Sequence, residues 1–260
     1  MRRFIVGSVL TLFAAGLGFA TEEQEESLRS LNKRVGTQAT APERETHFQK
    51  IVTRIDKLIE PILKSHSDPK EIAAGIKTTF GTDDEDRFDG AIKFESVPGT
   101  GEVVIAYDVP IIPAGNRVKV VLRLWTPAGP KGSGAVLRHL DDPGFADAEN
   151  FPVSAMGFLK HDGEWHLVLL GLNGNGHGKY ALSLWSLKES KCVWTWPLEY
   201  GDSCCFAVLG EDLFVRIAHN ELQNDEKDKY VSEEHFGWSD NGFVDLFTGP
   251  DKSPPLCELP

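Results

Sequence analysis

The sequence predicts a mainly β protein with N-terminal helices, of the α+β class, whose larger part is an antiparallel meander of about 11 strands. Apolar residues recur at helical spacing between residues 41 and 81. From residue 91 onward, short runs rich in Val, Ile, Leu, Phe and Trp alternate with turn residues. Three of these runs end in a large aromatic residue, Trp125, Trp185 and Phe247, at spacings of 60 and 62 residues. Repetition at a nearly fixed period is typical of stacked supersecondary units.

Residues 1–20 have the pattern of a signal peptide. Arg2 and Arg3 give a positive start, residues 5–17 are apolar or small, and the small residues that a signal peptidase recognises follow. We expect cleavage near Thr21, which makes the mature protein secreted or periplasmic and leaves no transmembrane span. An uncleaved membrane anchor is the alternative, although a spanning helix needs roughly 20 apolar residues.

The chain is strongly acidic. It carries 27 basic and 39 acidic residues, a net charge of −12, and loss of Arg2 and Arg3 with the signal peptide leaves 25 against 39, or −14. A field of this sign repels nucleic acid and anionic membrane surfaces, so we expect no nucleic-acid partner. The alternative role of the excess acid is simply to keep an exported protein soluble.

Residues 21–40 are predicted to be a polar leader. They contain only a weak helical stripe of apolar residues, Leu28, Leu31 and Val35. Because a stripe of this size buries little surface, we expect the leader to be mobile or marginally helical.

Residues 41–81 are predicted to be a helical pair. The first helix begins at Thr40-Ala41-Pro42-Glu43, which combines capping-box spacing with an early proline, and Pro61 should kink or end it. A second helix begins at Asp68-Pro69 and ends at Gly81. The apolar residues of the pair lie on one face. We expect this face to pack on the following domain, and binding of a partner is the alternative.

Residues 90–260 are predicted to be the β-meander domain. Its turns contain residue pairs that favour tight hairpins, such as Asp162-Gly163 and Asn241-Gly242. Residues 219–235 are charged and lack periodicity, which predicts a long surface insertion. The predicted strands are 91–96, 102–108, 117–126, 135–140, 153–161, 164–171, 179–187, 191–196, 204–209, 212–218 and 243–247.

One segment of the meander resembles a known repeat. Residues 153–196, with Phe-Leu-Lys-His-Asp-Gly at 158–163 and Leu-Ser-Leu-Trp at 182–185, resemble a WD-repeat propeller blade. Residues 172–177, Leu-Asn-Gly-Asn-Gly-His, are similar to the calcium loop of integrin-type blades. Both families are β-propellers, so the resemblance, which extends over about residues 117–247, implies a propeller-like arrangement. Eleven strands make fewer than three four-stranded blades, so an open sheet or a β-sandwich is the alternative.

A hairpin in this segment brings possible metal ligands together. If Asp162-Gly163 is a two-residue loop, His161 pairs with Glu164, and His166 lies on the same face of the hairpin. Two imidazoles and a carboxylate are the ligands of many zinc and non-haem iron sites, so a divalent transition metal is the one cofactor that the sequence suggests. The alternative is that these side chains are the solvated end of a hairpin.

The four cysteines, Cys192, Cys204, Cys205 and Cys257, are disulfide candidates because an exported protein can be oxidised. We expect Cys192 to bond one of the adjacent pair, which closes a loop of about a dozen residues. The alternative is that all four are small buried hydrophobic residues, since Cys192 alternates with two tryptophans along its strand.

These observations favour a non-catalytic binding or scaffolding protein with an unidentified protein or glycan ligand. A repeated β surface with six tryptophans suits recognition. The alternative is a metal-dependent hydrolase or oxygenase that uses His161, Glu164 and His166. The adjacent carboxylates Asp141 and Asp142 are predicted to form a turn rather than an acid–base pair, because neighbouring residues on a strand point in opposite directions.

Overall fold

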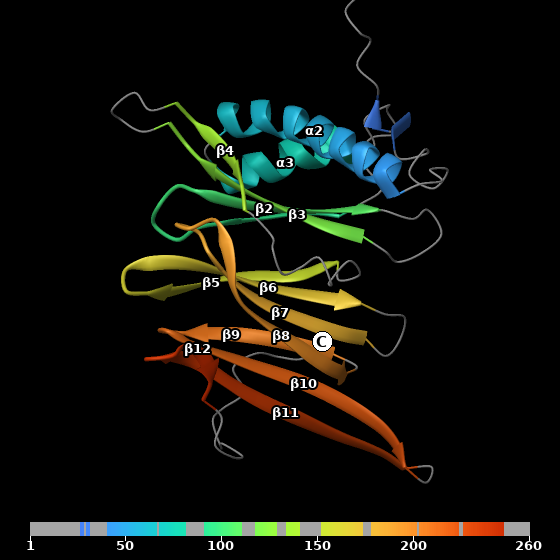
Figure 1. Cartoon of the computed structure of the whole chain (residues 1–260), viewed down its shortest axis with the longest axis vertical. Helices are drawn as coiled ribbons and strands as arrows, with labels where there is room; N and C mark the ends of the chain where they lie inside the picture. Colours follow the sequence, from blue (N-terminus) through green and yellow to red (C-terminus); the bar gives the residue numbers. More distant parts are fainter. Residues whose placement is uncertain are drawn as a thin grey trace, which may run out of the picture.

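The computed structural model has four layers, a pair of helices and three β-sheets stacked face to face (Figure 1). No described helix is long and apolar enough to cross a membrane. The structure describes residues 27–28, 30–31, 41–66, 68–81, 91–110, 118–128, 134–140, 152–173, 178–201, 203–223 and 226–246.

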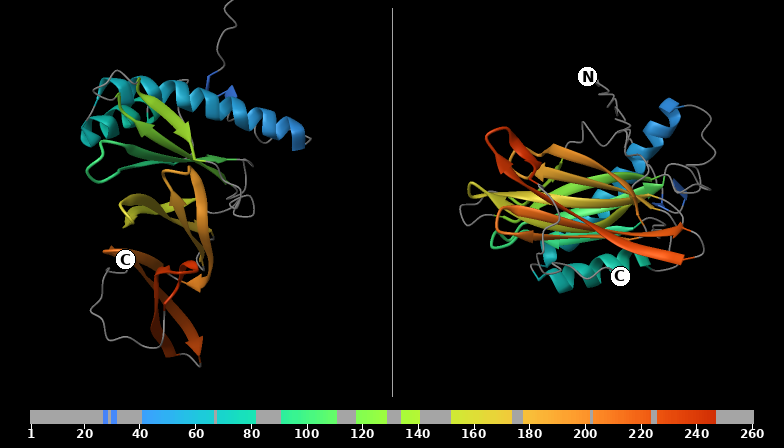
Figure 2. Two further views of the ribbon diagram at one scale, coloured as in Figure 1. Left: turned by 60° about the vertical axis from the view of Figure 1, so that its left-hand side comes forward. Right: turned by 90° about the horizontal axis from the view of Figure 1, so that it is seen from below.

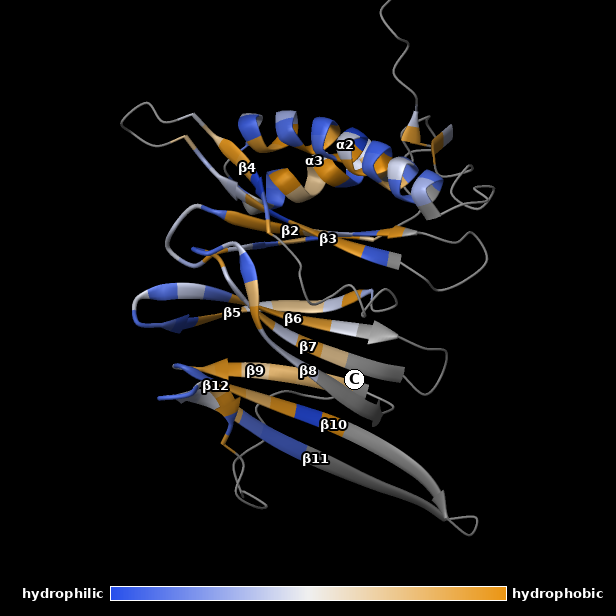
Figure 3. Ribbon diagram, in the orientation of Figure 1, coloured by the Kyte–Doolittle hydropathy of each residue, from blue (hydrophilic) through white to orange (hydrophobic). Residues whose placement is uncertain are grey.

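The two predicted helices are present. Helix α2 spans Ala41–Ser65 and continues through Pro61, and α3 spans Pro69–Gly81. The side chain of Asp68 caps α3 by accepting a 2.8 Å hydrogen bond from the Lys70 backbone N–H. Both helices turn their apolar side toward the first sheet and their charged side toward solvent (Figure 3), as expected for an amphipathic pair.

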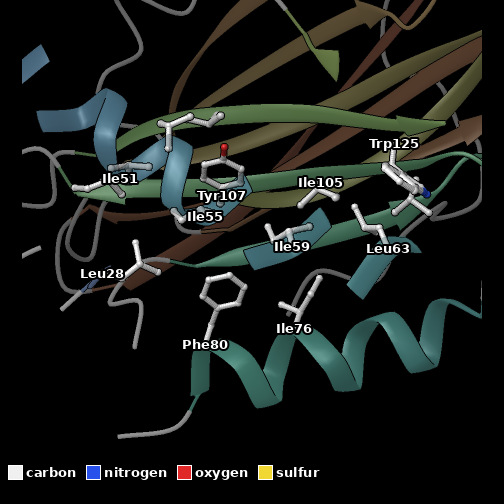
Figure 4. Packing of buried hydrophobic residues seen from close by; sticks show 14 of the residues in the cluster. Leu28, Ile51, Ile55, Ile59, Leu63, Ile76, Phe80, Ile105, Tyr107 and Trp125 are labelled. Carbon is white, nitrogen blue, oxygen red and sulfur yellow. The ribbon is translucent and has the colours of Figure 1, made fainter. Parts of the chain in front are cut away.

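The core below the helices also includes part of the leader. Leu28 and Leu31 are 0% and 2% exposed and belong to the same cluster as the helix residues. The backbone oxygen of Leu31 also lies 2.6 Å from Nε2 of His47. Of the two alternatives for the leader, mobile or marginally helical, the described residues fit the second, because Leu28, Ser30 and Leu31 are helical. Figure 4 shows the cluster, which includes Leu28, Ile51, Ile55, Ile59, Leu63, Ile76, Phe80, Ile105, Tyr107 and Trp125.

Sheet A lies directly under the helices. Its strands are β1 (Ile92–Ser96), β2 (Val103–Pro110), β3 (Val118–Thr126) and β4 (Val136–His139), paired in chain order and antiparallel. One face packs on the helices and the other on the next sheet. Because both faces are covered, the central strand β2 is almost continuously apolar instead of alternating.

Sheet B is the middle layer of the stack (Figure 2). Its strands are β5 (Val153–His161), β6 (Glu164–Asn173), β7 (Gly178–Ser186) and β8 (Lys191–Gly201), again an antiparallel meander in chain order. One buried cluster joins it to sheet A and a second joins it to the third sheet.

Sheet C is the last layer. Its strands are β9 (Ser203–Leu209), β10 (Asp212–Gln223), β11 (Glu226–Ser239) and β12 (Gly242–Asp245). The predicted surface insertion at 219–235 is wrong, because β10 and β11 pair without interruption in this region. Charged residues that alternate in sign give a strand no apolar periodicity, which explains the error.

The structure therefore confirms a mainly β chain with N-terminal helices, built from three four-stranded antiparallel meanders. The described residues contain twelve strands, and these form neither a closed barrel nor a closed propeller. Trp125 and Trp185 each lie one residue before the end of the third strand of their sheet. Trp238 has the same place in sheet C. Phe247, the predicted third position, lies outside the described residues.

A β-bulge in β8 explains why the preferred disulfide does not form. Leu184 pairs with Trp194, but the next residue, Trp185, pairs with Cys192, so Val193 is an extra residue in β8. Cys192 therefore packs between sheets A and B, on the opposite face from Trp194. Cys204 packs between sheets B and C. Sheet B separates the two sulfurs, and both residues carry thiols.

Candidate functional site

The β5–β6 hairpin has the predicted geometry. Asp162 and Gly163 form its two-residue turn with φ values of 49° and 80°, which fit a type I′ turn. His161 pairs with Glu164, and Leu159 pairs with His166. The hairpin therefore places both histidines and Glu164 on the face of sheet B that is turned toward sheet C.

Both histidines contact a tryptophan of sheet C. The ring of His161 stacks on Trp238 at a centroid distance of 4.0 Å and an interplanar angle of 7°. Its Nδ1 lies 2.8 Å from Oε2 of Glu211, in the β9–β10 turn. His166 lies 5.1 Å from the Trp238 ring. We call His161, His166, Glu211 and Trp238 the histidine–tryptophan cluster; it joins sheets B and C beside the hairpin turns.

Two polar atoms of this cluster are buried without a hydrogen-bond partner, Nδ1 of His166 and Nε1 of Trp238. His166 is only 6% exposed, and burial lowers the pKa of its imidazole below the usual value. Burial therefore favours the neutral form of this ring. Because an indole N–H only donates and a neutral imidazole nitrogen either donates or accepts, a hydroxyl group or a water molecule can satisfy both.

The predicted three-ligand set is not gathered around one point. The carboxylate of Glu164 pairs with the ammonium group of Lys188, in the β7–β8 turn, while His161 pairs with Glu211. Within the part of the chain that the structure describes, no three His, Cys, Asp or Glu side chains lie where they could share a metal ion. The hairpin register was predictable, but the competing partners come from turns far away in the sequence.

Four hairpin turns of sheets B and C meet above the cluster. The β5–β6 turn contacts the β9–β10 turn through His161 and Glu211, and the β7–β8 turn through Glu164 and Lys188. Trp238 lies next to the β11–β12 turn. We call the exposed charged residues of these turns the turn surface; it comprises Asp162, Lys188, Glu189, Glu211 and Asp240. Four of the five are acidic.

A partly buried ion pair docks α2 on sheet A. Arg123 makes a bidentate contact with Asp56 of α2, with Nη2 to Oδ2 at 2.9 Å and Nε to Oδ1 at 3.1 Å. The Tyr107 hydroxyl donates to Oδ1 of Asp56 at 2.8 Å. Burial is the main reason that the pKa of Tyr107 lies above its usual range. Because every charged atom of the pair is engaged within the fold, its role is to orient the helix.

A buried carboxylate lies between sheets A and B. Asp108 is 3% exposed, and its Oδ1 accepts a hydrogen bond from the Val153 backbone N–H at 3.2 Å. Burial raises its pKa to about 6, against the opposing effects of this hydrogen bond and of Lys93. Sequence reasoning missed this group. The sequence does contain a signal for it. Asp108 is the one charged residue of an apolar strand and lies on the same face as Val104 and Ala106.

Other predicted features lie outside the described residues. They are the signal peptide at 1–20, the Asp141-Asp142 pair, Cys257 and most of the loop at 172–177. No model of a protein family matches the chain, and no curated protein sequence matches it.

Proposed function

We propose that the protein is exported and acts as a non-catalytic binding or scaffolding protein, with a protein or glycan partner bound at the turn surface. The observation that carries this proposal is the convergence of four hairpin turns over the histidine–tryptophan cluster. Loops on a rigid framework are the usual place for recognition residues. Here the framework is a stack of sheets, and the cluster fixes the turns of sheet B relative to those of sheet C.

The chemistry of the surface favours a polar partner. Asp162, Glu189, Glu211 and Asp240 accept hydrogen bonds from hydroxyl or ammonium groups. A glycan supplies hydroxyl groups, and a protein with a basic surface supplies ammonium and guanidinium groups.

We further infer that the three meanders are successive units of an open, propeller-like repeat. The equivalent places of Trp125, Trp185 and Trp238 support this proposal, as does the resemblance of residues 153–196 to a propeller blade. Such repeats bury the face of each sheet against its neighbour and leave the turns at one end available for binding.

The test compares two variants with the same number of altered charges. D162N/E189Q/E211Q changes the turn surface but keeps the turn, because Asn also adopts positive φ. E45Q/E60Q/E71Q changes three exposed carboxylates of the helices. Immobilised mature protein is used to capture partners from the exported fraction of its own cell and is also applied to a glycan array.

For the partner found, we expect the turn variant to lose at least tenfold in affinity and the helix variant to bind like wild type. Equal affinity of the two variants would contradict the assignment of the site. Chemical conversion of the partner by the wild-type protein would contradict the non-catalytic role.

A further inference from the structure

Cys205 lies on the face of sheet C that is turned away from sheet B, which we call the outer face. Its neighbour Cys204 packs into the core between sheets B and C, as do Phe206 and Val208. Because side chains alternate along a strand, Cys205 must point to the other side. It lies opposite Arg216, which pairs with Glu233 on the outer face.

We propose that Cys205 forms a disulfide with Cys257 and that the C-terminal segment thereby crosses the outer face of sheet C. Cys205 is disulfide-bonded. The sequence has only three other cysteines. Cys204 points to the opposite face of its sheet, and Cys192 lies between sheets A and B, two sheets away. Cys257 is the remaining candidate.

The start of the C-terminal segment already lies on this face. After β12, the backbone N–H of Leu246 donates to the His235 oxygen at 2.7 Å. The side chain of Leu246 lies over Gly237, where an added Cβ would be 2.5 Å from Leu246 Cδ1. Gly237 is on the outer face, because its neighbours Phe236 and Trp238 belong to the core between sheets B and C. The absence of a side chain at Gly237 thus makes room for the segment.

The segment is long enough to make the bond. Strand β12 and strand β9 are the two edges of sheet C, so Leu246 and Cys205 are separated by three strand spacings, or about 14 Å at roughly 4.8 Å each. Cys257 lies eleven residues after Leu246, and an extended chain of that length spans up to about 36 Å. The reach exceeds the separation even if the path is not straight.

The bond forms by oxidation of the two thiols. Each thiol loses one proton and one electron, and the two sulfur atoms join. The oxidant is a protein or small-molecule disulfide of the exported compartment, which takes up the two electrons and two protons and becomes a dithiol. The inference thus uses the proposed export but not the proposed partner.

The two remaining thiols, those of Cys204 and Cys192, are protected from oxidation. Cys204 lies in the core, and burial raises the pKa of its thiol to about 12, so its reactive thiolate form is rare. Cys192 is half-buried between sheets A and B. We therefore expect Cys204 to remain a thiol, although its neighbour Cys205 is oxidised.

Peptide mapping without reduction tests the proposal. Cleavage after glutamate separates the cysteines into residues 190–199 with Cys192, residues 200–211 with Cys204 and Cys205, and residues 235–258 with Cys257. In protein secreted by its own cell, we expect the second and third peptides to be linked, and two alkylated thiols in the denatured, unreduced protein. A link that involves residues 190–199, or four alkylated thiols, would overturn the proposal.

Two variants of adjacent residues identify the bonded cysteine. C205S should abolish the link and lower Tm by about 10 °C, because the bond closes a loop of some fifty residues. C204S should keep the link. Reduction should lower the Tm of wild type and of C204S but not that of C205S. Loss of the link in C204S but not in C205S would contradict the assignment, and a disulfide-linked dimer of wild type would contradict an intramolecular bond.

Discussion

Asp108 should control much of the pH dependence of stability. Its folded-state pKa of about 6 lies above the usual value of 3.8 for an aspartate, because burial between sheets A and B disfavours the charged form. Because the folded-state pKa is raised, the protonated form of Asp108 stabilises the folded protein relative to the charged form. This contribution is fully present below about pH 4 and is lost as the pH rises through 6. Asp108 therefore costs stability at neutral pH.

We predict that Asp108→Asn stabilises the protein at pH 7.5 by on the order of 2 kcal/mol, since it removes the buried charge and keeps an acceptor for Val153. At pH 4 the variant and wild type should be equally stable. Denaturant unfolding at both pH values measures this. A variant that is less stable than wild type at pH 7.5 would show that the Lys93 interaction outweighs the burial of the carboxylate.

The two unsatisfied nitrogens of the histidine–tryptophan cluster lead to a second prediction about a single residue. Trp238→Phe removes a buried N–H that has no partner and keeps an aromatic ring against His161. We expect a loss of less than about 1 kcal/mol. Trp185→Phe is the matched control. It deletes an indole N–H that donates to the buried Ser183 hydroxyl at 2.8 Å, and should cost about 2 to 3 kcal/mol.

The comparison is made by the free energy of unfolding in urea for both variants and wild type. If Trp238→Phe costs as much as Trp185→Phe, the indole nitrogen of Trp238 has a partner in solution. An ordered water between Trp238 and His166 would be such a partner.

The position of an individual side chain could be predicted from the sequence only where local geometry decides it. The register of His161, Glu164 and His166 follows from the Asp162-Gly163 turn and is confirmed. Their partners Glu211 and Trp238 come from sheet C, about fifty to seventy residues later. No local rule indicates which turns meet when sheets stack, so the cluster could not be predicted.

At the scale of elements, the contact between β5 and β9 depends on one glycine. A Cβ at Gly157 would lie 2.8 Å from Cε2 of Phe206, closer than real Cβ contacts. Phe206 is partly buried and packs against the core between sheets B and C, which restricts its movement. We predict that Gly157→Ala costs about 1 to 3 kcal/mol by overpacking.

Two further variants test this explanation. Gly134→Ala, where a Cβ meets nothing within 4 Å, should change stability by less than about 0.5 kcal/mol. Phe206→Leu should recover part of the loss in the double variant, as a double-mutant cycle would show. If the losses in the free energy of unfolding from the two substitutions simply add in the double variant, sheets B and C do not meet at this point.

Elements with a strong periodicity were predictable, and those without it were not. Helices α2 and α3 begin and end near the predicted residues because their caps and apolar spacing are local signals. Strand β11 was missed because its charges hide any alternation. The bulge at Val193 also has no signature in the sequence, yet it reverses the side to which Cys192 points.

For the whole molecule, the sequence indicated three similar units but not how they join. Trp125 and Trp185, which are 60 residues apart, both lie in the third strand of a four-stranded meander. The structure stacks the units in chain order beneath the helices (Figure 2). The helices cover sheet A, so a closed ring in which sheet A also meets sheet C would have to displace them.

The open stack is the central claim, because the turn surface exists only if sheets B and C lie side by side in this order. Nuclear Overhauser contacts between methyl and aromatic groups test it most directly. We expect contacts from Leu124 of sheet A to Trp185 of sheet B, and from Trp194 of sheet B to Phe236 of sheet C, whose rings are 5.0 Å apart. We expect none between sheets A and C. A set of contacts from Leu124 to Leu213 or Val215 of sheet C would contradict the stack and indicate a closed arrangement.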